Sequence, residues 1–86
     1  MEKYNLLYTQ AFYNSLKSIP KKDVTRILRK TKSLANDPRP AESEKLVGKE
    51  RYRIRLGNYR ILYSIEDERL IVLVVKVGHR RQVYDR

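Results

Sequence analysis

The chain contains no cysteine and only one histidine, His79. Disulfide frameworks, thiolate zinc sites and cysteine nucleophiles are therefore excluded. A single histidine also excludes a two-histidine acid–base pair and any metal site that needs several imidazoles. With three glycines in 86 residues, the sequence has no glycine-rich loop of the kind that holds nucleotide phosphates.

Long apolar segments are absent as well. The longest purely apolar run is the six residues from Leu70 to Val75, whereas a membrane helix needs roughly 20. Residues 1–4 lead into no apolar signal region. We therefore expect a cytoplasmic protein without membrane contact, folded as a single domain over residues 1–86.

Positive charge is what the sequence has in excess. Twenty Lys and Arg residues stand against ten Asp and Glu, which gives a net charge of +10. A small domain this basic is typically a nucleic-acid binder or the partner of an acidic protein. Because 41% of the residues are apolar, the chain can still bury a small core and is not a disordered basic tail.

The first half of the chain predicts one strand and two helices. The strand is expected over Lys3–Tyr8, where apolar side chains alternate, and Thr9 can cap a helix that runs to about Ile19. A second helix is expected over Lys21–Asn36, before the sequence Asp-Pro-Arg-Pro ends it. We expect the two helices to form an antiparallel hairpin.

In the second half the apolar period changes to two, which predicts strands. Three are expected, over Arg51–Leu56, Tyr59–Glu66 and Leu70–Val77. Gly57-Asn58 has the composition of a two-residue hairpin turn. The segment from Gly78 to Arg81 interrupts the pattern, and Gln82–Tyr84 can add a last short strand. The predicted fold class is α+β, with the helical hairpin packed on a mainly antiparallel sheet.

The hairpin around Gly57-Asn58 indicates where the charge gathers. A two-residue turn pairs Arg55 with Arg60, and strand alternation then places four arginines on one face: Arg51, Arg53, Arg55 and Arg60. Like charges opposite one another destabilise a sheet, so folding alone does not call for them. Arginine suits phosphate because its planar guanidinium donates two hydrogen bonds at once. The pattern favours a polyanion-binding face, and a merely solvated face is the alternative.

Two other stretches are rich in basic residues. Near the C-terminus, Arg80 and Arg81 lie beside His79 and close to Tyr84. The second helix carries six cations, at Lys21, Lys22, Arg26, Arg29, Lys30 and Lys32. A solvated surface is the ordinary role of such a helix, but its near lack of acids makes it a candidate secondary contact for a nucleic-acid backbone.

Four spaced motifs carry a resemblance to a known family: Lys45-Leu46-Val47-Gly48, the hairpin Tyr52–Tyr63, Val77-Gly78-His79-Arg80 and Val83-Tyr84. With one strand, two helices and three strands in that order, the chain resembles the RelE/ParE toxin superfamily over nearly its whole length. The resemblance implies the toxin of a type II toxin–antitoxin pair. In RelE-like members it implies a ribosome-dependent endoribonuclease, without metal or cofactor, in which the 2′-hydroxyl of the mRNA attacks the next phosphate.

Carried over by motif, the resemblance implies five catalytic residues: Arg53, Arg55, Arg60, Arg80 and Tyr84. We expect four more to contact RNA, namely Lys45, Arg51, His79 and Arg81. RelE-like members often have lysine where this chain has Arg53 and Arg55. Arginine cannot act as a base at neutral pH, so the proton acceptor is Tyr84, His79 or water.

The implied partners are a cognate antitoxin with an acidic, largely disordered binding segment, the ribosome with its mRNA, and operator DNA reached through the antitoxin complex. ParE-like members, which inhibit DNA gyrase without cutting RNA, share the fold but generally lack the full basic cluster with its terminal tyrosine. The residue set therefore favours a RelE-like nuclease. A gyrase inhibitor is the alternative, and a third is a member that binds only its antitoxin and DNA.

Overall fold

The computed structural model describes residues 3–46 and 51–79. Arg80, Arg81 and Tyr84, with the short strand expected over Gln82–Tyr84, lie outside the described residues. The elements in chain order are β1 (Asn5–Tyr8), α1 (Gln10–Leu16), α2 (Lys21–Ser33), β2 (Ser43–Lys45), β3 (Arg51–Leu56), β4 (Tyr59–Glu66) and β5 (Ile71–His79). None of the helices in these two ranges is long and apolar enough to cross a membrane.

The helix α1 begins at the predicted cap and ends earlier than expected. The Thr9 hydroxyl oxygen accepts a hydrogen bond from the Phe12 N–H at 3.0 Å, and the hydroxyl itself donates to the Val75 carbonyl of β5. At the other end, the N–H groups of Lys17 and Ile19 bond to carbonyls three residues back. These tighter turns end the α-helix at Leu16, three residues before the expected end at Ile19.

The helix α2 also stops short of its predicted end. It was expected to reach Asn36, but the N–H groups of Leu34, Ala35 and Asn36 each bond to the carbonyl three residues earlier. The chain therefore leaves α-helical geometry after Ser33 and turns toward Pro38 and Pro40.

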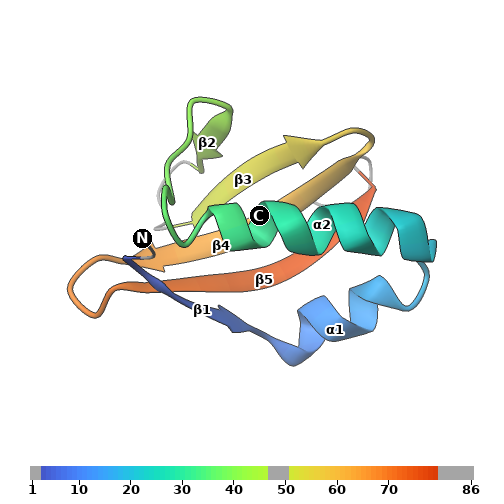
Figure 1. Ribbon diagram of the computed structural model, residues 1–86, viewed down its shortest axis with the longest axis horizontal. Coiled ribbons are helices and arrows are strands. Elements are labelled where there is room, and N and C mark those ends of the chain that lie inside the picture. Colours follow the sequence, from blue (N-terminus) through green and yellow to red (C-terminus); the bar gives the residue numbers. More distant parts are fainter. Residues whose placement is uncertain (1–2, 47–50, 80–86) are drawn as a thin grey trace.

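Five strands form one sheet in the order β1-β5-β4-β3-β2 (Figure 1). The β3–β4 pairing is as predicted, with Tyr52 opposite Tyr63 and Arg55 opposite Arg60. The strand β1 is parallel to β5, and all other pairs are antiparallel. The α+β class with a mainly antiparallel sheet is therefore confirmed.

Two features of the sheet differ from expectation. The strand β2 was not predicted, because three residues are too few to establish a period. The strand β5 runs through Gly78 to His79, where an interruption was expected, since Arg60 and Tyr59 of β4 supply partners for both. At its start, Leu70 belongs to the preceding turn, with a left-handed φ of 53°.

Both helices cover one face of the sheet, which we call the helix side (Figure 1). The core there joins Phe12 of α1 and Ile27 and Leu34 of α2 to the sheet residues Tyr52, Ile54, Ile61, Tyr63, Ile65, Val72, Val74 and Val77. Its polar groups have partners. The Tyr63 hydroxyl donates to the Pro38 carbonyl at 2.7 Å, and burial raises the pKa of Tyr63 to about 12.

A polar clamp closes one end of this core. Arg39 donates from both terminal nitrogens to the Asp67 carboxylate, at 3.2 and 2.9 Å, and from Nε to the Tyr52 hydroxyl at 3.0 Å. The Tyr4 hydroxyl donates to the same carboxylate at 2.7 Å. These bonds tie the segment after α2 to the β4–β5 turn and to the start of β1.

Candidate nucleic-acid interface

The face of the sheet away from the helices, here called the open face, gathers the predicted arginines. Arg51 lies opposite Ser64, Arg53 opposite Leu62 and Arg55 opposite Arg60. These register positions alternate with the core residues Tyr52, Ile54 and Ile61, so all four arginines point to the open face. We call Arg51, Arg53, Arg55 and Arg60 the arginine face.

Two of these guanidinium groups hold buried donors without a partner. Nε of Arg53 and Nε of Arg60 are both buried, and neither has a hydrogen-bond partner among the described residues. A terminal nitrogen of Arg53 reaches Glu44 of β2 at 3.5 Å. Buried donors are nearly always paired, because leaving one unpaired costs about 1–3 kcal/mol. An anion on the open face would supply the missing acceptors.

A lysine that the sequence analysis did not select also reaches this face. The register between β4 and β5 shifts between Leu62 and Tyr63, so that Lys76 lies opposite Leu62 and Val77 opposite Ile61. Strict alternation from Val72 and Val74 would have turned Lys76 toward the core. The bulge directs it to the open face and places Val77 in the core. The only signal in the sequence was a lone lysine inside an apolar run.

Between the cations lies an apolar side chain. Leu62 is 1% exposed yet belongs to the open face, with Arg53 and Lys76 as its neighbours across the strands. Long cationic side chains commonly lay their methylene stems over such a residue. The open face therefore combines an apolar floor with guanidinium and ammonium groups around it.

Two predicted RNA contacts lie elsewhere. Lys45 is paired with Tyr52, which places it on the opposite face from Arg53. His79 is paired with Tyr59 and therefore also belongs to the helix side, where the two rings lie 5.5 Å apart. Tyr59 and His79 line a cavity of about 420 Å³ at the α1–α2 turn. The structure thus separates Lys45 and His79 from the arginine face.

The environment of Tyr59 is set by a carboxylate. Its hydroxyl donates to Asp23 of α2 at 2.8 Å, and this bond raises the pKa of Tyr59 above its ordinary value. Tyr59 is therefore held as a neutral donor. Across residues 3–46 and 51–79, no three His, Cys, Asp or Glu side chains form a group that could hold a metal ion.

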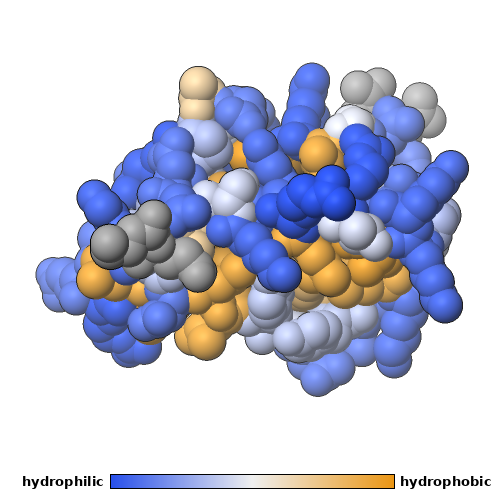
Figure 2. Space-filling model, in the orientation of Figure 1, coloured by the Kyte–Doolittle hydropathy of each residue, from blue (hydrophilic) through white to orange (hydrophobic). Residues whose placement is uncertain are grey.

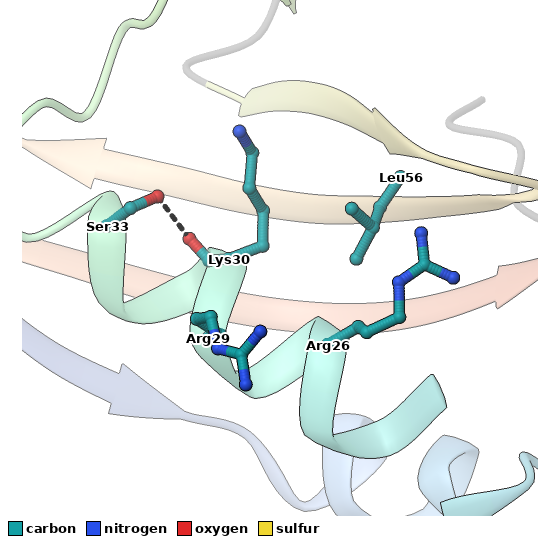
Figure 3. Close-up of a pocket in the computed structure, with 5 residues that line it drawn as sticks. All are labelled: Arg26, Arg29, Lys30, Ser33 and Leu56. Carbon is teal, nitrogen blue, oxygen red and sulfur yellow. Dashed lines mark hydrogen bonds between the residues drawn. The ribbon is translucent and has the colours of Figure 1, made fainter. Parts of the chain in front are cut away.

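A second basic surface lies on the helix side. Arg26, Arg29, Lys30 and Ser33 of α2, with Leu56 of β3, line a hollow of about 270 Å³ (Figure 3). Figure 2 shows strongly hydrophilic side chains across this side of the molecule, with apolar surface between and below them. Arg29 also lines a neighbouring hollow with Thr25, Leu28 and Lys32. Four of the six cations noted in the second helix, Arg26, Arg29, Lys30 and Lys32, thus line these two hollows.

Comparison with known proteins identifies relatives. The family model described as the ParE toxin of the type II toxin–antitoxin system parDE matches residues 6–84. Toxin RelG of Mycobacterium tuberculosis (strain ATCC 25618 / H37Rv) is 43% identical over 35 residues, which are 41% of this chain. The match covers only 40% of the length of that relative.

Solved structures are similar over most of the chain. The archaeal RelE–RelB complex from Pyrococcus horikoshii OT3 gives a TM-score of 0.82 at 29% identity and covers 94% of this chain and 99% of that one. The RelBE2 toxin–antitoxin complex of M. tuberculosis gives 0.81 at 25% identity, covering 91% and 99%. The isolated E. coli RelE toxin gives 0.75 at 25% identity, covering 88% and 83%.

Proposed function

The chain belongs to the RelE/ParE superfamily and is a toxin of a type II toxin–antitoxin system, and we propose that it cuts mRNA on the ribosome as a metal-independent endoribonuclease. The observation that carries the proposal is the pair of buried, unpartnered Nε donors of Arg53 and Arg60. They come from neighbouring strands and lie beside Arg55 on one face. A phosphodiester supplies the acceptors that these donors lack.

The proposed reaction is an attack within the RNA itself. The ribose 2′-oxygen forms a bond to phosphorus while the P–O5′ bond breaks, leaving a 2′,3′-cyclic phosphate and a 5′-hydroxyl. The 2′-hydroxyl gives up its proton and the leaving O5′ takes one up. Negative charge grows on the phosphoryl oxygens of the pentavalent transition state, so preorganised guanidinium groups lower the barrier.

The residues divide this work by their chemistry. Arg60, with Arg80, contacts the scissile and flanking phosphates, while Arg53 and Arg55 stabilise the charge of the transition state. None of them can accept the proton, because a guanidinium stays protonated at neutral pH. We assign the proton transfer to Tyr84, since His79 lies on the opposite side of the sheet, against Tyr59.

Toeprinting of mRNA on ribosomes tests the proposal. We expect cuts within the decoding site when the purified toxin is added, and no cuts in the same mRNA without ribosomes. RNA fragments that end in a 2′,3′-cyclic phosphate would support attack by the 2′-hydroxyl. Intact mRNA under these conditions contradicts the nuclease function.

A gyrase-inhibiting toxin is the second candidate, because the matching family model describes a ParE toxin. Such a protein binds its target without cutting RNA. The two functions separate in one experiment: DNA breaks in the presence of gyrase, with intact mRNA on ribosomes, would favour the ParE-like function.

The partners follow from the relatives and from the charge. The similar complexes from P. horikoshii and M. tuberculosis pair a toxin with its antitoxin, which supports a cognate antitoxin for this chain. We propose that an acidic antitoxin segment, largely disordered alone, neutralises the basic surface and brings the pair to operator DNA in the cytoplasm. Expression without antitoxin should arrest growth, whereas normal growth with abundant folded protein would contradict a toxin of either kind.

A further inference from the structure

Basic side chains continue from the arginine face around the tip of the β3–β4 hairpin. Arg55 and Arg60 face each other on the last rung before the turn. Gly57 of the turn, at φ +60°, lies close to Arg26 of α2, and a Cβ built on Gly57 would lie 3.6 Å from an Arg26 terminal nitrogen. The hairpin tip therefore has guanidinium groups on both of its sides.

Beyond the tip, the cations run along one side of α2. Arg26, Lys30 and Ser33 are spaced by four and three residues, so they share a side of the helix. In Figure 3 the side chains of Arg26 and Lys30 lie on either side of Leu56, the apolar residue that lines the hollow. From Arg26 to Ser33 the helix spans about 10 Å. A surface of this length can contact adjacent phosphates of one strand through its arginine, lysine and serine side chains.

Nearby carboxylates neutralise this surface only in part. Arg26 is 3.6 Å from Asp23, and its side chain is 52% exposed. Lys30 pairs with Glu42. Arg29 makes no ion pair or hydrogen bond within the described part of the chain, although it lines both hollows of α2. In each pair one side chain is largely buried, Asp23 at 17% and Lys30 at 24% exposure, so an incoming phosphate most readily reaches Arg26 and Arg29.

We propose that this surface binds the backbone of single-stranded RNA that continues from the scissile phosphate, around the hairpin tip and onto α2. We name it the α2 track and define it by Arg26, Arg29, Lys30, Ser33 and Leu56. The inference rests on the proposed function, because the RNA must first occupy the arginine face. Binding is to phosphates and therefore independent of sequence, while Leu56 offers apolar surface to a ribose or a base.

An acidic protein segment is the competing occupant. Continuity with the arginine face favours RNA, since one strand can engage both surfaces and Gly57 leaves no side chain between them. A protein segment would need no such continuity. The length of RNA required for tight binding therefore distinguishes the two.

The experiment compares short and long RNA. The probes are 2′-O-methyl oligouridylates of about 4 and about 16 nucleotides, whose 2′-oxygens cannot attack phosphorus. Each phosphate contact makes the binding constant scale with salt concentration to the power of about −0.7. One contact therefore raises the binding constant about fivefold at 0.1 M salt relative to 1 M salt. We expect Arg26→Ala/Arg29→Ala to weaken the 16-mer about 25-fold and to leave the 4-mer unchanged. Alanine preserves α2 because it is the best helix former.

A matched control removes the same charge elsewhere. Lys3→Ala/Arg69→Ala also takes away two positive charges, at the opposite end of the sheet from the hairpin tip. It should lower the affinity for each of the two RNAs by less than about twofold. If the α2 variant lowers the affinity for the 4-mer and the 16-mer equally, or by no more than this control does, the α2 track is wrong.

Two further measurements keep the α2 track separate from the arginine face. If the 4-mer binds Arg60→Ala as tightly as it binds the parent protein, the arginine face does not bind RNA. The proposed function is then wrong, whatever the result for the α2 variant. An oligoglutamate peptide of about 16 residues tests the competing occupant. Should the α2 variant lose more affinity for this peptide than for the RNA 16-mer, the surface takes an acidic protein segment and the RNA proposal is overturned.

Discussion

The two faces of the sheet treat polar groups in opposite ways. On the helix side the buried Tyr63 hydroxyl is bonded to a backbone carbonyl, and neighbouring strand positions fill a continuous apolar core. On the open face, Arg53 and Arg60 bury donors that have no partner among the described residues. Ile61 and Leu62 are adjacent in sequence, yet one belongs to the core and the other to the floor beneath the arginines. The helix side maintains the fold, whereas the open face has buried donors without acceptors among the described residues.

The open face therefore carries costs to stability that the helix side does not. Four arginines on alternate rungs of one hairpin repel one another, and each unpaired buried donor costs about 1–3 kcal/mol. Local rules of this kind are usually broken where a site serves function. A phosphate would remove both costs at once, since it neutralises the charge and accepts from the guanidinium groups.

The largest effect should come from the helix side. Ile61→Ala removes a fully buried side chain and should cost about 2–5 kcal/mol of unfolding free energy. Leu73→Ala should cost less, because Leu73 is only half-buried and lies on the open face beside Ser64. Urea denaturation of both variants measures the difference. Equal losses would mean that the open face is packed as tightly as the core.

The arginine face should behave in the reverse way. Arg53→Ala and Arg60→Ala should each slow cleavage by about 10²-fold, the scale of losing one preorganised donor. Their unfolding free energy should hold or rise slightly, because like-charge repulsion is relieved. Cleavage on ribosomes and urea denaturation are measured on the same samples, with Arg69→Ala as the matched control. Arginine variants that unfold would identify a structural face.

Proton transfer should show a smaller effect. Tyr84→Phe keeps the ring but removes the hydroxyl, and should slow cleavage by at least about 10-fold while preserving binding to ribosomes and antitoxin. His79→Gln should cleave close to the parental rate, since His79 pairs with Tyr59 on the helix side. The opposite outcome, a slow His79 variant with a normal Tyr84 variant, transfers the role to His79. Normal rates in both leave the reaction to arginine electrostatics and positioning.

The smallest effect concerns the clamp at the end of the core. Hydrogen bonds from Arg39 and then from Tyr4 lower the pKa of Asp67 below its ordinary value. A lowered folded-state pKa adds stability above the ordinary aspartate pKa, and this stability is lost as pH falls through the lowered value. Asp67→Asn should therefore have a lower melting temperature than the parent at pH 7. The difference between the two melting temperatures should shrink as the pH falls below about 4. A gap that is constant with pH would contradict a role for the Asp67 charge.

Much of the fold follows from periodicity and turn chemistry. The two-residue turn at Gly57-Asn58 is enough to fix the β3–β4 register, because the pairing of one rung determines all others. The Thr9 cap was likewise readable from sequence. Helix ends were not, since the i→i−3 bonds after Leu16 and Ser33 depend on how the chain approaches its neighbours.

The candidate site was only partly readable from the sequence. Alternation within one hairpin placed the four arginines together correctly. The position of Lys76 depends on a bulge between β4 and β5, which no local pattern announces. Lys45 and His79 lie on the helix side, away from the arginine face. Strand alternation predicts this only once the pairing of β2 and the full length of β5 are known.

The central claim is that the open face binds phosphates through its arginines. The salt dependence of single-stranded RNA binding measures this most directly. On an RNA too short to reach the α2 track, four to five phosphate contacts, made by Arg51, Arg53, Arg55, Arg60 and Arg80, should give a log–log slope of about −3. Arg60→Ala should make the slope shallower by about 0.7, the share of one contact. A slope near zero, or a slope that Arg60→Ala leaves unchanged, would contradict the account.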